Sequence, residues 1–301
     1  MIPAYYAGTQ GHVFLCLHGA GHSALSFAAL AKLMKQEPYN STVVSFDFRG
    51  HGSHFCENES DMSQQTLIGE TIKVLKHVIS KFPTQSLILV GHSMGGSIAT
   101  KTIEFITTHH KDEGWIDHIK GLFIIDVVEG SAMDALPFME SIVSSRPSKF
   151  PDVQSVVKYG VSSGTVRNVD SAKVSMPAQV IKKADASGKE LWVWRTDLLA
   201  SKQYWTQWFK DLTKTFLGLR IPKQLLLAGN DRMDKELTIA HMQGKFKMVV
   251  IDNVGHVIQE DRPQEVASVF KQFLDKFHIP SLHKDQMVIT TISGKKVVIN
   301  Q

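Results

Sequence analysis

Short apolar runs alternate with amphipathic stretches along most of the chain. Apolar runs of about four to eight residues without polar alternation are typical of strands buried on both faces of a parallel sheet. Stretches with helical spacing lie between them. The predicted strands are Val13–Leu17, Ser41–Phe48, Leu87–Val90, Gly121–Ile125, Lys223–Leu227 and Phe246–Ile251, and the predicted helices are Thr66–Ser80, Ser97–Thr108 and Pro263–Phe277. This order predicts an α/β fold with a mostly parallel, doubly wound sheet.

One long stretch, Ser131–Gly218, interrupts the alternation. It is too long for a loop and is rich in Met and Trp, and its spacing is mostly helical. We expect a single domain over residues 1–301, with 131–218 as an inserted helical cap above the edge of the sheet where ligands bind in such folds. At the end of the chain, Met287–Ile292 and Lys296–Asn300 predict a hairpin with a turn at Ser293-Gly294-Lys295.

Composition narrows the function classes. The chain has 301 residues, of which 43% are hydrophobic and 21% are charged, as in ordinary globular proteins. Its 33 basic and 29 acidic residues give a net charge of +4, too small for a nucleic-acid-binding surface. No apolar run approaches the ~18 residues of a membrane span. Two cysteines, Cys16 and Cys56, give no disulfide framework, so we expect an intracellular protein of the cytoplasm, the nucleus or both.

The strongest chemical motif is Gly91-His92-Ser93-Met94-Gly95. It is a G-x-S-x-G sequence placed after a predicted strand and before a predicted helix, where it forms a tight turn that exposes the serine. The flanking glycines avoid clashes across that turn, and the helix amides favour developing negative charge. The motif predicts Ser93 as a nucleophile.

A second motif, His18-Gly19-Ala20-Gly21, follows the first predicted strand. Acyl transfer needs two hydrogen-bond donors for the tetrahedral oxyanion. In this architecture they are backbone amides, which we assign to Met94 and Ala20. We expect His18 to brace this loop. His18 and His22 have no suitably spaced third ligand, so we expect no metal and no other cofactor.

A serine nucleophile needs a base within hydrogen-bond reach. Of the fourteen histidines, His256 combines a late position, a strand end and a preceding glycine, and histidine titrates near neutral pH. The acid that orients it is open, because Asp126 and Asp231 both follow strand ends between Ser93 and His256. The position of Asp231, directly after the inserted segment, favours it slightly on the residues alone.

Several longer segments of the chain resemble those of a known protein family. They include Leu17–Ser26, Gly91–Gly96, Ile125–Leu136, Arg167-Asn168, Ser171–Met176, Tyr204-Trp205, Trp208-Phe209, Leu226–Asp234 and Met242–Phe246. Over about residues 12 to 277 the chain resembles the α/β-hydrolase fold and, more narrowly, the protein phosphatase methylesterase family. The serine motif is shared by many hydrolases, whereas the segment that begins at Ile125 is far more specific.

The resemblance implies a carboxyl methylesterase without a cofactor. Its substrate and partner would be the catalytic subunit of protein phosphatase 2A, whose methyl-esterified C-terminal leucine would give a free carboxylate and methanol. The family's nucleophile falls on Ser93, its base on His256 and its acid on Asp126. The resemblance therefore favours Asp126 over Asp231.

Two other functions fit the same residues. A general small-ester carboxylesterase would use the same catalytic groups and would hydrolyse short esters without a protein partner. A non-catalytic phosphatase-binding protein on the hydrolase fold would normally lack a catalytic residue. Both candidate acids, the serine and the histidine are present here. We expect the cap tryptophans, which are Trp192, Trp194, Trp205 and Trp208, mainly to pack within the cap.

Overall fold

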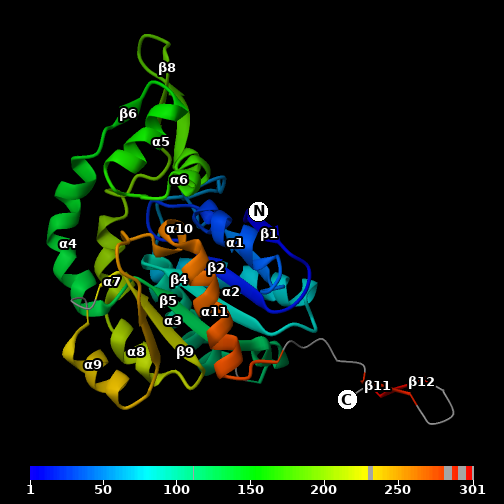
Figure 1. Cartoon of the computed structure of the whole chain (residues 1–301). Coiled ribbons are helices and arrows are strands. Elements are labelled where there is room, and N and C mark those ends of the chain that lie inside the picture. The colour runs from blue at the N-terminus through cyan, green and yellow to red at the C-terminus, as the bar shows by residue number, and fades with distance from the viewer. Residues whose placement is uncertain (111, 230–232, 281–286, 291–295, 300–301) are drawn as a thin grey trace.

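The computed structural model describes residues 1–110, 112–229, 233–280, 287–290 and 296–299 (Figure 1). Its centre is a seven-stranded sheet in the order β1-β3-β2-β4-β5-β9-β10. All neighbours are parallel except β1 and β3. The predicted α/β fold is confirmed. The strands are β1 (Ala4–Ala7), β2 (Val13–Leu17), β3 (Thr42–Phe46), β4 (Leu87–His92), β5 (Ile119–Ile125), β9 (Lys223–Leu227) and β10 (Lys247–Val250).

The central strands are apolar throughout because helices cover both faces of the sheet. On β2, Val13, Leu15 and Leu17 face one hydrophobic core, while Phe14 and Cys16 face the other. Helices α2, α3 and α9 pack on the first face, and α1, α10 and α11 on the second (Figure 1). Their bounds are α1 (Ala28–Met34), α2 (Gln64–Lys81), α3 (Met94–His109), α9 (Lys235–Met242), α10 (Ile258–Asp261) and α11 (Pro263–Lys276). Within the described ranges, no helix is long and apolar enough to cross a bilayer.

The segment between β5 and β9 contains more than the predicted helices. Strands β6, β7 and β8 form a separate three-stranded antiparallel sheet in addition to the helices of this segment. These strands escape detection because they are half-exposed and mix charged with apolar residues. The elements are α4 (Glu129–Ser144), β6 (Lys149–Phe150), α5 (Val153–Ser162), α6 (Val169–Ser175), β7 (Val180–Ala184), β8 (Glu190–Trp194), α7 (Trp205–Phe209) and α8 (Leu212–Gly218).

This segment packs in two ways. The part from β6 to β8 stands above the sheet in Figure 1 and has a small core of its own, which includes Phe150 and Met176. In contrast, α7 and α8 pack against the central core through Trp205, Trp208 and Phe216. The indole Nε1 of Trp208 donates a hydrogen bond to the Met62 carbonyl at 2.8 Å. The division into one domain with residues 131–218 as its cap stays a prediction.

Two smaller features complete the chain. β1 was not predicted, because it is a short, partly exposed edge strand. Near the C-terminus, β11 (Met287–Thr290) and β12 (Lys296–Ile299) pair antiparallel, which confirms the predicted hairpin for these residues. The turn predicted at 293–295 lies outside the described residues. Short 3₁₀ helices span Ala24–Phe27, Gly114–His118, Pro177–Gln179 and Lys202–Tyr204.

Aromatic residues between the sheet and α11 allow the packing of the helices on the sheet to be tested. Phe270 is fully buried, and its ring lies 4.9 Å from that of Phe14 and 4.4 Å from that of Phe123. We expect Phe270→Ala to lower the free energy of unfolding by about 3–5 kcal/mol in urea denaturation, because it leaves a cavity. Phe138 is 66% exposed, and Phe138→Ala should change this free energy by less than about 0.5 kcal/mol. Equal effects would contradict the packing described.

Candidate active site

Ser93 occupies a strained turn between β4 and α3. Its φ of 53° and ψ of −122° are unusual for a residue with a side chain. The turn is tight, since a Cβ on Gly91 would lie 2.2 Å from the Gly95 carbonyl oxygen, and one on Gly95 would lie 2.3 Å from that of Leu17. Side chains at both glycine positions are therefore excluded. The backbone N–H of Ser93 donates to the Ile125 carbonyl at 3.0 Å, which ties this turn to the end of β5.

His256 and Asp126 lie in direct contact. The Nδ1 atom of His256 is 2.7 Å from Oδ2 of Asp126. The Asp126 side chain is fully buried directly after β5, and its Oδ1 accepts the Ala228 N–H at 2.9 Å. His256 follows β10, and its side chain is 45% exposed. The structure thus brings together two of the predicted residues, whereas the alternative acid Asp231 lies outside the described residues.

The Ser93 hydroxyl is not hydrogen-bonded to His256 in this structure. Within the described ranges, its Oγ makes no side-chain hydrogen bond. The ring of His92, the residue before Ser93, lies 4.6 Å from that of His256.

The loop after β2 lies against Ser93. A Cβ on Gly19 would lie 3.1 Å from Cβ of Ser93 and 2.9 Å from Nδ1 of His92. The next residue, Ala20, is partly buried, and Met94 begins α3. Among the described residues, neither the Ala20 nor the Met94 N–H is used in a hydrogen bond. Two amide donors are thus available beside the serine.

Two buried histidines brace this loop in their neutral form. His18 Nδ1 lies 2.8 Å from the Gly19 carbonyl, while its Nε2 accepts the Phe48 N–H at 3.0 Å. His51 Nε2 accepts the Gly21 N–H at 2.9 Å. Burial lowers the pKa of both imidazoles to about 3. A ring nitrogen that accepts an N–H must be unprotonated, so neutral histidines suit these contacts. These contacts agree with the expectation that His18 is a bracing residue.

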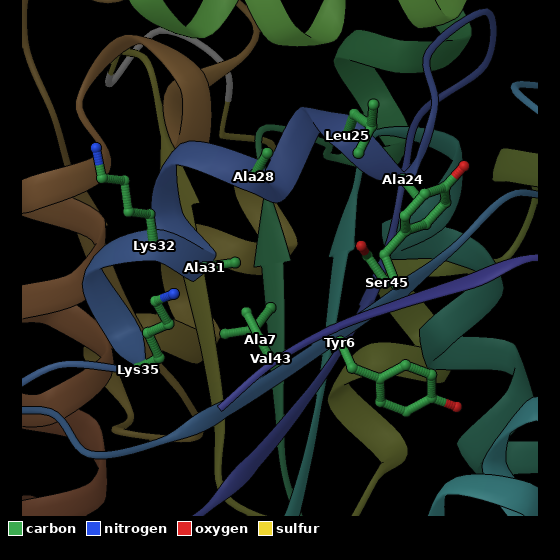
Figure 2. Close-up of a pocket in the computed structure, with 11 residues that line it drawn as sticks. Tyr6, Ala7, Ala24, Leu25, Ala28, Ala31, Lys32, Lys35, Val43 and Ser45 are labelled. Atoms are coloured by element: carbon green, nitrogen blue, oxygen red, sulfur yellow. The ribbon is translucent and has the colours of Figure 1, made fainter. Parts of the chain in front are cut away.

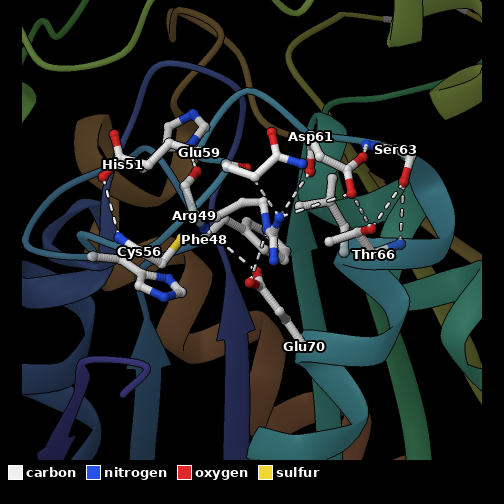
Figure 3. Close-up of polar contacts among 12 residues, drawn as sticks. Phe48, Arg49, His51, Cys56, Glu59, Asp61, Ser63, Thr66 and Glu70 are labelled. Carbon is white, nitrogen blue, oxygen red and sulfur yellow. Dashed lines mark hydrogen bonds and ion pairs between the residues drawn. The ribbon is translucent and has the colours of Figure 1, made fainter.

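Charged pairs secure the loop between β3 and α2. Nε of Arg49 lies 2.9 Å from Oε1 of Glu70, and its Nη1 donates to the carbonyls of Asn58 and Asp61 (Figure 3). From the inserted segment, Arg195 reaches the same loop and binds Glu59 through two nitrogens, at 2.7 and 2.8 Å. The hydrogen bond from Arg195 is the main reason that the pKa of Glu59 is lowered. The loop is therefore bonded both to α2 and to the insertion.

Sequence reasoning missed two residues that hold the His256 loop. Nε2 of His92 lies 2.8 Å from the His256 carbonyl oxygen. Burial, reinforced by His256, keeps the pKa of His92 well below its usual value, so His92 serves as a neutral donor. Asp261 accepts the Gly255 N–H at 2.6 Å and, from the insertion, the Arg167 N–H at 2.7 Å. These contacts could not be predicted from the local sequence, because the bonded residues are far apart in the chain or lie in irregular loops.

A separate pocket lies away from these residues. It has a volume of about 240 Å³. Residues of β1, β3 and the α1 region line it, with Tyr6, Val43 and Ala28 on its walls and Lys32 and Lys35 at one end (Figure 2). None of its lining residues is Ser93, Asp126 or His256. This pocket is therefore not where these three residues would meet a substrate.

Comparisons with known proteins agree with the fold. The α/β hydrolase family model matches residues 14–269, which defines the class of this protein. Solved structures with the same fold include an E-2-(acetamidomethylene)succinate hydrolase (TM-score 0.70, 18% identity, 91% of this chain and 95% of that one). Another is a thioesterase domain from the curacin biosynthetic pathway (TM-score 0.65, 21% identity, 90% and 95% covered).

Proteins with similar sequences indicate which family of α/β hydrolases the chain belongs to. A probable protein phosphatase methylesterase 1 of Caenorhabditis elegans is 40% identical over 275 residues, which are 91% of this chain and 72% of that protein. The protein phosphatase methylesterase 1 of Homo sapiens is 35% identical over 308 residues, covering 90% and 77%. The chain belongs to the protein phosphatase methylesterase family. The resemblance expected from its motifs is confirmed.

The buried histidines predict how stability depends on pH. Burial lowers the pKa of His12, His18, His22, His51 and His92 below 6.5. Below pH 6.5 the unfolded chain therefore binds more protons than the folded one, and stability falls as the pH drops. Each such histidine contributes a slope of up to about 1.4 kcal/mol per pH unit. We expect His51→Gln to reduce the slope between pH 4.5 and 5.5 by about 1 kcal/mol per pH unit in urea titrations. An unchanged slope would contradict a neutral, buried His51.

Proposed function

We propose that this protein is a serine carboxylesterase that removes the methyl ester from the C-terminal leucine of the protein phosphatase 2A catalytic subunit. The observation that carries the proposal is the 2.7 Å contact of His256 with buried Asp126, on the sheet edge that also carries Ser93. Membership of the methylesterase family supports the substrate class. Because that substrate is intracellular, we also propose an intracellular location, in the cytoplasm, the nucleus or both.

In the proposed reaction, Ser93 is the nucleophile and His256 its general base. The Ser93 hydroxyl first turns toward Nε2 of His256, which then accepts its proton. The serine oxygen attacks the ester carbonyl, and methanol leaves with a proton returned by His256. Water, activated by the same histidine, hydrolyses the acyl-enzyme and releases the carboxylate.

The oxyanion of each tetrahedral intermediate would be bound by the N–H groups of Ala20 and Met94. Both are unused donors among the described residues, and Met94 stands at the N-terminus of α3, where the helix dipole favours negative charge. The bonds of His18 and His51 hold the Ala20 loop before substrate arrives. A donor positioned in advance requires no reorganisation during the reaction.

Asp126 is the proposed acid of the triad. Its contact with Nδ1 of His256 holds the proton there and leaves Nε2 free to accept one. The bond from the Ala228 N–H fixes the second carboxylate oxygen, so the carboxylate cannot rotate freely. Asp261 and His92 would act as positioning residues, since both hold the loop that carries His256.

The test is methyl release from the carboxymethylated phosphatase 2A core enzyme. We expect Ser93→Ala and Asp126→Asn each to lower kcat/KM by about 10³-fold or more, because they remove the nucleophile and the group that orients its base. The matched control is Asp231→Asn, which should remain largely active.

The other outcomes identify the alternatives. A wild-type protein that hydrolyses small esters but releases no methyl group from the phosphatase would be a general carboxylesterase. One that does neither and still binds the phosphatase would be a non-catalytic binding protein. Loss of activity in Asp231→Asn but not in Asp126→Asn would replace the proposed acid.

A further inference from the structure

Arg146 lies against an aromatic cluster in the inserted segment, just after α4. Its guanidinium carbon is 4.5 Å from the centroid of the Trp194 ring. That ring lies 6.0 Å from Tyr159 and 5.4 Å from Phe150, and its Nε1 donates to the Pro147 carbonyl at 2.8 Å. The aromatic neighbours and this hydrogen bond fix the plane on which the guanidinium stacks. The cation is therefore held in place rather than free in solvent.

The guanidinium has no anionic partner among the described residues. Its Nε is buried and makes no hydrogen bond there, and burial lowers the pKa of the group. A buried donor without an acceptor costs about 1–3 kcal/mol. A second cap cation shows the contrast, because Lys182 also lies over a tryptophan, Trp192, but pairs with Glu190 at 2.9 Å. Arg146 is thus suited to take a carboxylate from outside the chain, which its planar donors bind in pairs.

The aromatic cluster that holds Arg146 lies close to the loop of His256. Trp194 packs against the small core of the insertion, and that core includes Val257, the residue after His256. The positive charge of Arg146 acts on His22, which belongs to the loop after β2. Burial is the main cause that lowers the pKa of His22 to about 3, and the charges of His256 and Arg146 act in the same direction. The His22 ring lies 5.4 Å from that of His92, the neighbour of Ser93. The packing around Trp194 and Val257 thus places Arg146 near the proposed catalytic residues.

We propose that Arg146 determines specificity by binding an acidic side chain of the substrate tail, a few residues before the methyl ester. This rests on the proposed function, in which the substrate is the C-terminal tail of a protein. The methyl ester is neutral and offers a guanidinium no charge to bind. An aspartate or glutamate upstream supplies the carboxylate that Arg146 lacks.

The test compares two short peptides that end in a leucine methyl ester and inhibit hydrolysis of a small chromogenic ester. They differ only in one residue within about four positions of the ester, acidic in one and its amide in the other. We expect wild type to bind the acidic peptide about tenfold more tightly, which corresponds to about 1.4 kcal/mol. In Arg146→Gln the two inhibition constants should become equal. Comparing the two peptides within each variant cancels any general loss of activity, and thermal melting checks the fold.

Lys182→Gln is the matched control, because it removes a cap cation that has its own carboxylate, and it should keep the tenfold preference. The proposal is overturned if wild type shows no preference, if neither peptide binds, or if the preference survives in Arg146→Gln. A third peptide, which ends in a free leucine carboxylate, tests binding of the product. The proposal is also overturned if Arg146→Gln weakens the binding of this peptide only, since Arg146 would then bind the product carboxylate. A wild type that prefers the acidic peptide but releases no methyl group from the phosphatase keeps this inference and loses the proposed function.

Discussion

One buried carboxylate connects the strand ends on which the candidate site stands. Asp126 follows β5, bonds the Ala228 N–H after β9, and contacts His256 after β10. These strands are adjacent in the sheet. The Asp126 side chain has no exposure to solvent, so its charge would be costly without such partners. Because a single group holds three loops together, the position of His256 depends on it more than on any surface contact.

The close approach of backbone segments around Ser93 is the second constraint on the geometry of the candidate site. The turn at Ser93 has no room for side chains at Gly91 or Gly95. The loop after β2 also lies close to this turn, since a Cβ on Gly19 would be 2.9 Å from Nδ1 of His92. This closeness brings the Ala20 and Met94 amides to the serine. Neutral histidines then bond the loop on its far side, and burial keeps them neutral by lowering their pKa. The tight backbone and the buried imidazoles thus support the same geometry.

Local patterns sufficed to predict much of this structure. The apolar runs give six strands of the central sheet because helices bury both of their faces. The Ser93 turn is also predictable, since it rests on glycines at fixed spacing. The strands of the insertion were not, because they are half-exposed and their pattern is mixed. Contacts such as that between Asp261 and the Arg167 amide join distant residues, and no local pattern encodes them.

The acid that pairs with His256 could not be identified from local sequence patterns alone. Asp126 and Asp231 both follow strand ends in the required chain order, and only the reach of a carboxylate to His256 separates them. The family resemblance favoured Asp126, and the structure describes its contact with His256. That Asp126 acts as the catalytic acid remains a proposal. Its φ of 51° is a further sign of a constrained position.

The most direct test of the account is the rate at which an aryl phosphonate labels the serine. The label reacts with an activated hydroxyl and requires no protein substrate, and mass spectrometry of the digested protein locates it. We expect wild type to be labelled at Ser93 alone, and folded Asp126→Asn to be labelled about 10³-fold more slowly. Equal labelling rates in the two proteins, or a label on another residue, would contradict the account.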